Sequence, residues 1–233
     1  MKTTDADIDT DNPFTHVPAS NILLFKQIGL PLKHSKVGNL VLLERDGYRG
    51  VLKDYRNYGF FYSLFIGPFL VNREIRICNS LKNISGIPKI YSRIDRAAFI
   101  AEYLDGVPAN RMSPSRISET FFKNLSALVD DIHEQGWVHG DLKISSNILV
   151  MPNDKAGIVD FQTAFSRNGS FKHIRNFFFN QFVLFDRLGI LKLKNKLRPD
   201  LLTEEEKHML SRKTFLMRIA RTYRWFVRKL VKR

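Results

Sequence analysis

The sequence predicts an α+β protein, in which a small strand-rich N-terminal part precedes a mainly helical C-terminal part. Two apolar runs separated by Asp46-Gly47 are typical of a β-hairpin, because this dipeptide suits the positive φ angles of a two-residue turn. Residues 89–93 and 97–103 read as two further strands. From about residue 106 the apolar residues follow helical spacing, so we expect the second part to be mainly helical.

The N-terminal part is expected to contain two helices beside its strands. Residues 19–29 predict a short helix that a glycine and a proline close. Residues 57–84 predict a longer helix with a break near Gly67-Pro68. The apolar stripe of this longer helix consists of Ile75, Cys78 and Leu81. The two hairpin strands are Leu40–Glu44 and Tyr48–Asp54.

The C-terminal part is expected to begin with a helix that starts at Ser113-Pro114, a capping residue followed by proline in the first turn. The apolar face of this helix consists of Leu125, Leu128, Val129 and Ile132. Strands at 148–150 and 157–160 flank a turn at 152–154, and the chain after about residue 171 is expected to be helical.

Length and composition limit the class of protein. With 233 residues the chain can form one domain or two small lobes. Its single cysteine, Cys78, suits a reducing compartment and reads as a small buried hydrophobic residue. Residues 1–18 read as a disordered acidic tail without a signal peptide. The apolar run 60–71 is about half the length of a membrane span, so we expect it to pack in the core, with a membrane-facing surface as the alternative.

The net charge of +14 is concentrated at the C-terminus. Residues 212–233 carry nine Lys and Arg and no acid, and predict an amphipathic helix with one apolar face. Such a helix binds an anionic membrane surface, or its apolar face packs on the rest of the protein while the cations are solvated. Nucleic acid is a third candidate partner, ranked below the membrane because no recognisable reading motif is present.

Five polar residues have the types and the order that phosphoryl transfer needs. Lys53 lies on the strand after the hairpin turn and Glu74 on the helix that follows. The segment "VHGDLKISSNILV" (138–150) presents Asp141 and Asn147 on a loop, and Asp160 follows the next short strand. Carboxylate and amide oxygens are the ligands that Mg²⁺ prefers.

With "IHEQGWVHGDL", the spaced Asn and "DF", the chain resembles the protein-kinase-like superfamily over about residues 33–165. Its resemblance is to the small bacterial and atypical branch, which includes lipopolysaccharide-core kinases, RIO-type kinases and aminoglycoside-phosphotransferase-like enzymes. The resemblance implies a reduced two-lobe kinase fold, with a small antiparallel sheet and one key helix in the N-lobe and a mainly helical C-lobe. It also implies ATP and Mg²⁺ as cofactors.

The resemblance implies a role for each matching position. The catalytic positions are Asp141, as the base, and Lys143, on the transferring phosphate. The metal ligands are Asn147 and Asp160. The nucleotide-binding positions are Lys53 on the phosphates, Glu74 paired with Lys53, Gly38 in the covering loop, and Glu102 with Tyr103 in the lobe-joining segment whose backbone would bind the adenine.

The sequence departs from the kinase pattern in four places. One extra residue separates Asp141 from Asn147, and it either bulges out or moves Asn147 away from the metal. Gln162 replaces the glycine of the usual "DFG", which predicts a segment that does not switch conformation. The covering loop has only Gly38, and no "APE" closes an activation segment. The first three departures motivate the rival hypothesis of a catalytically inactive pseudokinase, and the missing "APE" argues against a peptide groove of the standard kind.

We therefore expect four segments: an acidic tail at 1–18, an N-lobe at 19–105, a reduced C-lobe at 106–211 and a basic amphipathic helix at 212–233. The leading hypothesis is a kinase that transfers the γ-phosphate of ATP to a protein Ser/Thr or to a glycolipid sugar. The expected location is the cytoplasm, peripheral on the inner face of the cytoplasmic membrane if the tail binds lipid.

Overall fold

The structure, a computed structural model, describes residues 12–15, 26–28, 39–56 and 59–211. The chain divides into two compact units. The first unit consists of residues 1–106 together with 157–162, and the second of residues 107–156 together with 163–233. The predicted basic helix at 212–233, Gly38 and most of the predicted acidic tail lie outside the described residues.

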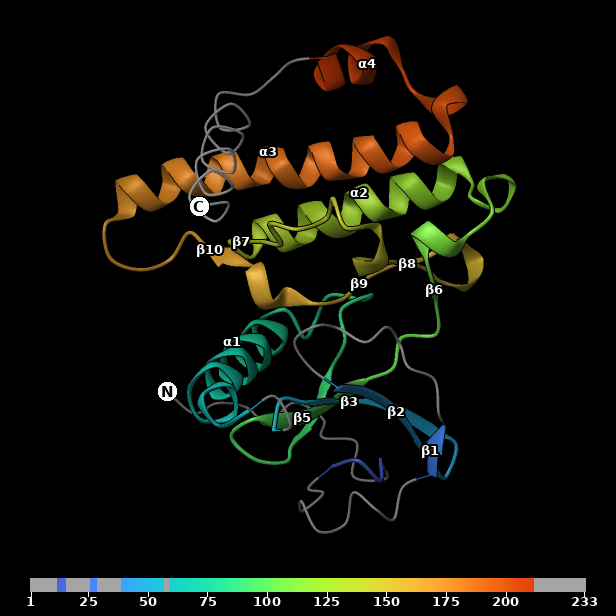
Figure 1. Cartoon of the computed structure of the whole chain (residues 1–233). Helices are drawn as coiled ribbons and strands as arrows, with labels where there is room; N and C mark the ends of the chain where they lie inside the picture. Colours follow the sequence, from blue (N-terminus) through green and yellow to red (C-terminus); the bar gives the residue numbers. More distant parts are fainter. Residues whose placement is uncertain (1–11, 16–25, 29–38, 57–58, 212–233) are drawn as a thin grey trace, which may run out of the picture. The chain divides into compact units, whose positions relative to one another are not determined.

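The first unit is built on a five-stranded antiparallel sheet with the strand order β1-β2-β3-β5-β4 (Figure 1). The predicted hairpin is confirmed, because Arg45 pairs with Tyr48 across a turn in which Asp46 and Gly47 both have positive φ. The predicted helix at 19–29 is wrong where it is described, since β1 pairs there with β2. The strands are β1 (Lys26–Ile28), β2 (Asn39–Arg45), β3 (Tyr48–Asp54), β4 (Ile90–Arg93) and β5 (Ala98–Glu102).

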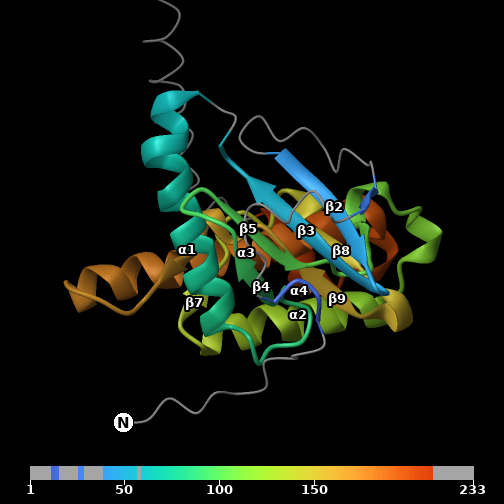
Figure 2. The ribbon, with the colours of Figure 1, turned by 90° about the horizontal axis from the view of Figure 1, so that it is seen from below.

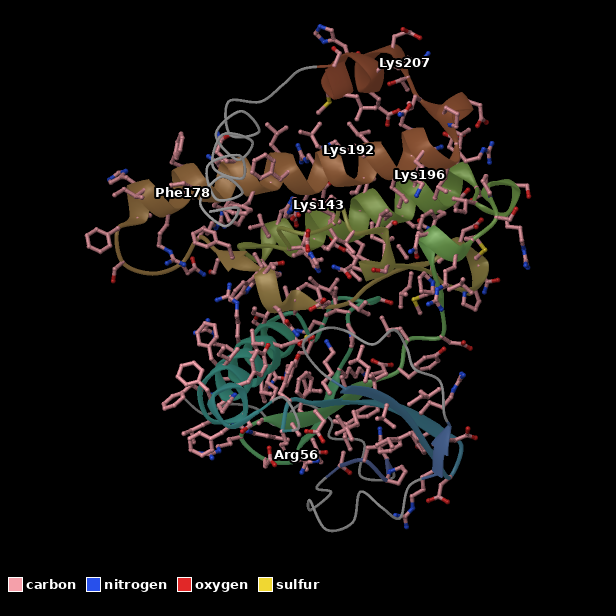
Figure 3. All side chains as sticks on the ribbon, viewed as in Figure 1. Arg56, Lys143, Phe178, Lys192, Lys196 and Lys207 are labelled. Carbon is pink, nitrogen blue, oxygen red and sulfur yellow. The ribbon has the colours of Figure 1, made fainter. Side chains whose placement is uncertain are left out.

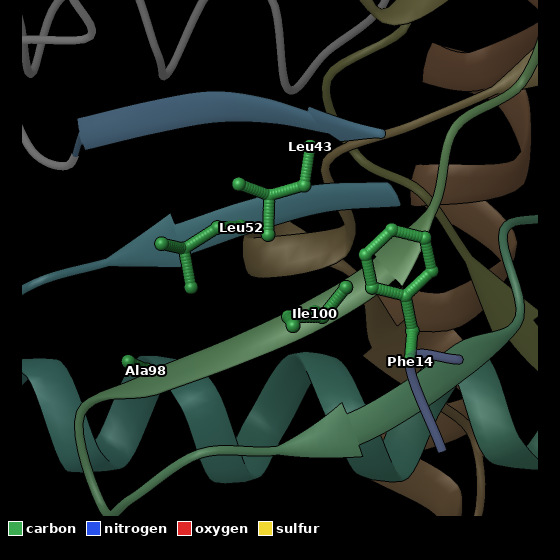
Figure 4. Close-up of a cluster of buried hydrophobic side chains, with 5 residues drawn as sticks. All are labelled: Phe14, Leu43, Leu52, Ala98 and Ile100. Atoms are coloured by element: carbon green, nitrogen blue, oxygen red, sulfur yellow. The ribbon is translucent and has the colours of Figure 1, made fainter. Parts of the chain in front are cut away.

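Both faces of this sheet are covered. Successive side chains of a strand point to opposite faces, so Phe99 and Ala101 of β5 pack with Val71 of the helix α1. On the other face Ala98 and Ile100 pack with Leu43, Leu52 and Phe14 (Figure 4). The interior strand β5, between β3 and β4, is therefore buried on both sides, which fixes its register.

Residues 12–15, near the end of the predicted disordered tail, are ordered. Residues 12–15 form a turn in which the Asn12 side chain accepts a hydrogen bond from the Phe14 backbone N–H over 3.0 Å. The turn holds Phe14 fully buried and stacked on Tyr91, with 5.8 Å between the ring centroids. The prediction of disorder is wrong for these four residues, because one large aromatic side chain anchors them to the sheet.

The helix α1 (Gly67–Ser80) crosses one face of the sheet within the first unit (Figure 2). The predicted break at Gly67-Pro68 is replaced by a π-helical turn, η2 (Tyr62–Ile66), that leads directly into α1. A proline clashes with the carbonyl group one turn before it, and a widened turn relieves that clash. The predicted core packing of the run 60–71 fails for four aromatic side chains, which are exposed: Phe60, Phe61, Phe65 and Phe69.

The second unit is mainly helical, and together with the first unit it confirms the predicted α+β class. Its first long helix, α2 (Glu119–Glu134), begins after Ser118, whose side chain accepts a hydrogen bond from the Phe121 backbone N–H over 3.0 Å. The predicted start at Ser113-Pro114 is wrong, since only a short 3-10 turn, η4 (Pro114–Arg116), forms there. The predicted apolar face of α2 is confirmed, because all four of its residues are buried.

The long helix α3 (Lys172–Leu197) packs along α2, and α4 (Glu204–Ser211) follows it (Figure 1). Short strand pairs complete the unit, with β6 (Val107–Pro108) on β8 (Ile148–Val150) and β7 (Trp137–Val138) on β10 (Phe165–Ser166). The chain returns to the first unit through β9 (Ala156–Ile158), which ends two residues before the predicted end of this strand. The remaining 3-10 turns are η3 (Ala109–Arg111), η5 (Ser145–Asn147), η6 (Pro152–Asp154), η7 (Phe161–Thr163) and η8 (Pro199–Leu201).

Among the helices that the structure describes, none is long and apolar enough to cross a membrane.

Candidate functional site

The predicted residues fall into two sets, one in each unit. In the first unit, Lys53 on β3 forms an ion pair with Glu74 on α1. The side chains are 13% and 4% exposed, so both charges are largely removed from water. Lys53 Nζ also lies 5.8 Å from the centre of the Phe99 ring. A buried charge is tolerated when it is paired, and each of these two residues supplies the partner of the other.

Asp160 adds a second carboxylate near Lys53. Burial alone would lower the pKa of Lys53, but attraction to Glu74 and Asp160 outweighs burial, and the pKa is raised above its usual range. The lysine is therefore charged at all physiological pH values. Asp160 has a left-handed backbone (φ 70°), and its buried Oδ1 accepts no hydrogen bond from the described residues. This carboxylate oxygen is available for a cation.

Gln162 fastens the segment after Asp160 to both the sheet and the helix of the first unit. Its side-chain amide donates a hydrogen bond to Tyr55 Oη, and its backbone carbonyl accepts one from Arg73 Nε over 2.8 Å. Burial, together with Glu74 and Asp160, raises the pKa of Tyr55, although Lys53 opposes the change, so the phenol stays protonated. A glycine at position 162 would have no side chain for the bond to Tyr55. The absence of switching in this segment stays a prediction, and these two hydrogen bonds are the contacts that would oppose a switch.

Glu102 and Tyr103 lie at the end of β5, where the predicted adenine-binding segment begins. The Glu102 backbone N–H donates to the Lys89 carbonyl over 2.8 Å, and the Tyr103 N–H donates to the Arg49 carbonyl over 3.3 Å. Both backbone donors are therefore already used inside the unit. An adenine would bind through the carbonyl groups of this segment, or would displace the longer of the two bonds.

In the second unit, Asp141 lies on a loop that its neighbours hold in place. The Asp141 backbone N–H donates to Nδ1 of the fully buried His139 over 3.3 Å, which makes that ring nitrogen an acceptor. The His139 carbonyl accepts a hydrogen bond from Thr163 Oγ1 over 2.9 Å. Between them Gly140 has a φ of 80°, and a Cβ there would lie 3.3 Å from the Thr163 carbonyl oxygen. The left-handed backbone and the nearby carbonyl oxygen favour glycine at this position.

Asp186 of α3 supports the same loop, and sequence reasoning missed it. This residue is 1% exposed, and its carboxylate accepts hydrogen bonds from the backbone N–H groups of His139 over 2.7 Å and Gly140 over 2.8 Å. His133 Nε2 lies 3.2 Å from the same carboxylate. A lone acid inside the apolar run of α3 is the signal that could have revealed it, since a buried carboxylate needs donors.

One turn after Asp186, Gly189 allows α3 to approach the loop closely. A Cβ at this position would lie 3.0 Å from the Leu142 carbonyl carbon and 3.0 Å from the Lys143 nitrogen. Helix α3 thus supplies the carboxylate that accepts the hydrogen bonds of the loop, and its Gly189 leaves room for the loop backbone.

The extra residue between Asp141 and Asn147 is absorbed by two consecutive tight turns. The Ile144 N–H donates to the Asp141 carbonyl over 3.2 Å, and the Asn147 N–H donates to the Ile144 carbonyl over 2.9 Å. Ile144 is exposed at the outside of the double turn. Asn147 is buried, and its Nδ2 donates to the Asp141 carbonyl over 3.4 Å. Asn147 therefore stays next to Asp141, and its amide oxygen is the atom that a metal ion would need.

Lys143 extends from the loop with a side chain that is 66% exposed, and its Nζ lies 3.4 Å from Asp141 Oδ1. The Asp141 side chain is only 19% exposed, and its Oδ1 accepts no hydrogen bond from the described residues. A flexible cation beside an underused carboxylate oxygen suits a role in neutralising an incoming phosphate.

Each unit contains one side chain of a type that Mg²⁺ accepts as a ligand. In the first unit Asp160 offers a buried carboxylate oxygen that accepts no hydrogen bond from the described residues, and in the second unit Asn147 offers an amide oxygen. Within the described ranges no group of three His, Cys, Asp or Glu side chains is placed to hold a metal. Mg²⁺ does not require such a cluster, because it is usually held by one or two carboxylates, waters and the phosphates of its substrate.

The sequence was compared with protein-family models and with curated proteins. No protein-family model matches the chain. The chain is 32% identical over 99 residues to NUAK family SNF1-like kinase 1 from mouse and from human, a match that covers 39% of the chain and 15% of each relative. Most of each relative therefore lies outside the match.

Solved structures extend the likeness to most of the chain. The Rio2 kinase of Chaetomium thermophilum, in a complex with ADP/Mg²⁺ and phosphoaspartate, superposes with a TM-score of 0.57 at 16% identity, over 81% of this chain and 63% of that one. A second Rio2 structure from the same organism gives a TM-score of 0.56 at 15% identity, over 80% and 62%. The chain thus spans slightly less than two thirds of the Rio2 structures. The chain therefore has a protein-kinase-like fold, similar to that of these two Rio2 kinases.

Proposed function

We propose that the protein is an ATP- and Mg²⁺-dependent phosphotransferase that moves the γ-phosphate of ATP to a hydroxyl group. The observation that carries the proposal is the buried pair of Lys53 and Glu74 with the Asp160 carboxylate in the same unit. A lysine that two carboxylates keep charged is suited to meet phosphate oxygens. Burying three charges in a small unit is costly, so a ligand that uses them explains why they are there.

The proposed reaction gives a role to the residues of each set. The acceptor hydroxyl attacks the γ-phosphorus, the bond from that phosphorus to the β–γ bridging oxygen breaks, and ADP leaves. Asp141 accepts the hydroxyl proton, and Lys143 stabilises charge on the transferring group. Lys53 orients the phosphates, and Asp160 and Asn147 would hold the metal. When bound, Mg²⁺ neutralises charge on the phosphate oxygens.

The acceptor is proposed to be a protein Ser/Thr or a glycolipid sugar. Lys143 favours a protein acceptor, because it matches the lysine that protein kinases keep at this position. The basic segment 212–233 favours a lipid-linked sugar. One of the two Rio2 structures is a complex with phosphoaspartate, so an aspartyl phosphate is also a candidate intermediate in this chain.

The proposed location is the cytoplasm, on the inner face of the cytoplasmic membrane. Two features support a membrane surface as partner. The segment 212–233 carries nine cations and no acid. Residues 60–71, which include η2 and the start of α1, expose Phe60 and Phe69, which are 80% and 60% accessible. Nucleic acid ranks below the membrane as a partner.

The test is transfer of the γ-labelled phosphate of ATP into lysate and membranes by the full chain. Label is counted separately in the protein and lipid fractions, and its loss in hydroxylamine reports an acyl phosphate. Asp141→Asn is the inactive variant, and Asp131→Asn, an exposed position on α2, is the matched control. Label that depends on Asp141 but not on Asp131 is expected, and the fraction that carries it identifies the acceptor class. Absence of label from a folded, nucleotide-binding chain contradicts the proposal and favours the pseudokinase.

A further inference from the structure

The first turns of α3 expose a continuous group of apolar side chains in the second unit. We call this group the α3 apolar patch; it consists of Phe171, Ile174, Phe177 and Phe178. Phe171 is 79% exposed and Ile174 is 59% exposed. At this end α3 extends beyond α2 in both views of the ribbon (Figures 1 and 2), and Phe178 marks the position of the patch on the helix (Figure 3). Large apolar side chains gathered in this way on a surface are typical of an interaction site.

A cationic hollow lies beside the patch. It has a volume of about 450 Å³ and is lined by Arg167, Asn168, Gly169, Lys172 and Asn176. The sequence contains no Asp or Glu between Asp160 and Asp186, so the whole segment around the hollow is positive. The apolar patch and the positive hollow therefore form one surface, with Lys172 next to Phe171.

Aromatic rings, not acids, position the arginines of this surface. Arg167 lies over the Phe179 ring at 5.7 Å, and Arg175 lies over the Phe165 ring at 4.7 Å. Arg175 Nη2 also donates to the Ser166 carbonyl over 2.6 Å. Among the described residues, no acid forms an ion pair with Arg167, Lys172 or Arg175. Their charges thus remain available to an anionic partner.

We infer that this surface binds an anionic lipid bilayer, with the α3 apolar patch in the interfacial region and the cations against headgroup phosphates. Exposed aromatic and aliphatic side chains rimmed by Lys and Arg are what an interfacial contact requires. The segment 212–233 is a poor occupant, because its nine cations would be repelled by this positive surface. A second copy of the same surface would be repelled in the same way. The inference does not depend on phosphate transfer.

An environment-sensitive dye tests the location of the contact directly in the full chain. The single native cysteine, Cys78, is buried, so an introduced cysteine is labelled selectively. His173→Cys places the dye within the surface without removing an apolar side chain, and Ser126→Cys, at an exposed position on α2 of the same unit, is the control. With vesicles of phosphatidylcholine and phosphatidylglycerol, the emission of the dye at 173 is expected to shift to the blue, and that at 126 is not. Vesicles of phosphatidylcholine alone are expected to give no shift.

Matched variants test the two components of the surface. Phe171→Asn and Ile174→Gln together remove two apolar side chains, and the φ of 59° at position 171 is one that asparagine adopts readily. Lys172→Glu reverses one cation in the hollow, and Lys192→Glu makes the same charge change farther along the same helix (Figure 3). Because each cation near an anionic leaflet contributes about 1 kcal/mol, Lys172→Glu is expected to weaken vesicle binding by about ten-fold or more. Lys192→Glu is expected to change it by no more than about two-fold.

Three outcomes would overturn the inference. Vesicle binding of the chain without a shift at position 173 would assign the contact to another segment. A shift of equal size with neutral vesicles would remove the role of the cations. A shift produced by an acidic or phosphorylated peptide, and not by anionic vesicles, would assign the surface to a protein partner.

Discussion

The ion pair of Lys53 and Glu74 predicts a strong energetic coupling that a double-mutant cycle measures. Lys53→Met leaves Glu74 buried and uncompensated, with Oε2 already lacking a hydrogen bond from the described residues. Breaking a buried pair in this way costs about 3–5 kcal/mol of unfolding free energy. Glu74→Met leaves Lys53 near Asp160, so we expect a smaller cost of about 2 kcal/mol.

The double variant Lys53→Met/Glu74→Met replaces both charges with apolar side chains of similar volume. Replacement of a whole buried pair is often neutral or stabilising, so we expect the double variant to lie within about 1 kcal/mol of the wild type. The coupling energy would then be at least about 4 kcal/mol. The double variant should nevertheless lose nucleotide binding, which separates the structural role of the pair from its proposed function.

Hydrogen exchange of the β3 and α1 amides is the suitable assay, because it reports the first unit alone. The raised pKa of Lys53 sets the pH dependence. A raised folded-state pKa gives stabilisation that is complete below the unfolded value, about 10.4, and is lost only as the pH rises through the folded value. The coupling energy is therefore expected to be equal at about pH 6 and about pH 9. Purely additive single effects would refute the account of a buried, mutually compensating pair.

Three further changes test other parts of the structure. Gln162→Gly removes the hydrogen bond to Tyr55 and adds backbone freedom, so amide exchange of residues 159–163 should become about ten-fold faster. An unchanged exchange rate would show that the Gln162 side chain does not hold this segment in place. Asp186→Asn should cost about 2–3 kcal/mol in urea unfolding because one backbone donor of the loop loses its acceptor, whereas Asp130→Asn, at a surface pair, should cost less than about 1 kcal/mol. Burial, aided by Glu74 and opposed by Lys53, raises the pKa of Cys78 to about 12. Above about pH 8.5 the unfolded thiol ionises and the buried one does not, so the wild type should lose about 1.4 kcal/mol of unfolding free energy per pH unit relative to Cys78→Ala. If the unfolding free energies of the two proteins change equally with pH, the thiol is not buried and neutral.

Local signals in the sequence were sufficient for the elements that depend on local chemistry. Asp46-Gly47 specifies the hairpin because the turn needs positive φ, and the spacing of four apolar residues specifies the buried face of α2. The order of the polar residues also indicated which side chains would carry charge in the first unit. Lys53 and Glu74 indeed meet, although 21 positions separate them.

Features that depend on distant contacts could not be predicted in this way. Ser113 and Ser118 are both suitable N-caps, and packing, not local sequence, selects Ser118. Phe14 lies in an acidic stretch, and only the sheet that it covers explains its order. The bond from His139 to Asp186 joins residues 47 positions apart, so no local pattern announces it. The sequence left open whether the extra residue moves Asn147, and the two backbone hydrogen bonds of the double turn show that Asn147 stays next to Asp141.

The central claim is that Lys53, Glu74 and Asp160 of the first unit bind a complex of Mg²⁺ and ATP. Titration of ATP into the full chain, with and without Mg²⁺, tests it most directly and needs no knowledge of the acceptor. The wild type should bind ATP at least about ten-fold more tightly with Mg²⁺, a difference of about 1.4 kcal/mol. Asp160→Asn should lose this difference, while Asp105→Asn, an exposed position in the same unit, should keep it. Equal affinity with and without Mg²⁺ in the wild type, or no binding of ATP at all, would contradict the claim.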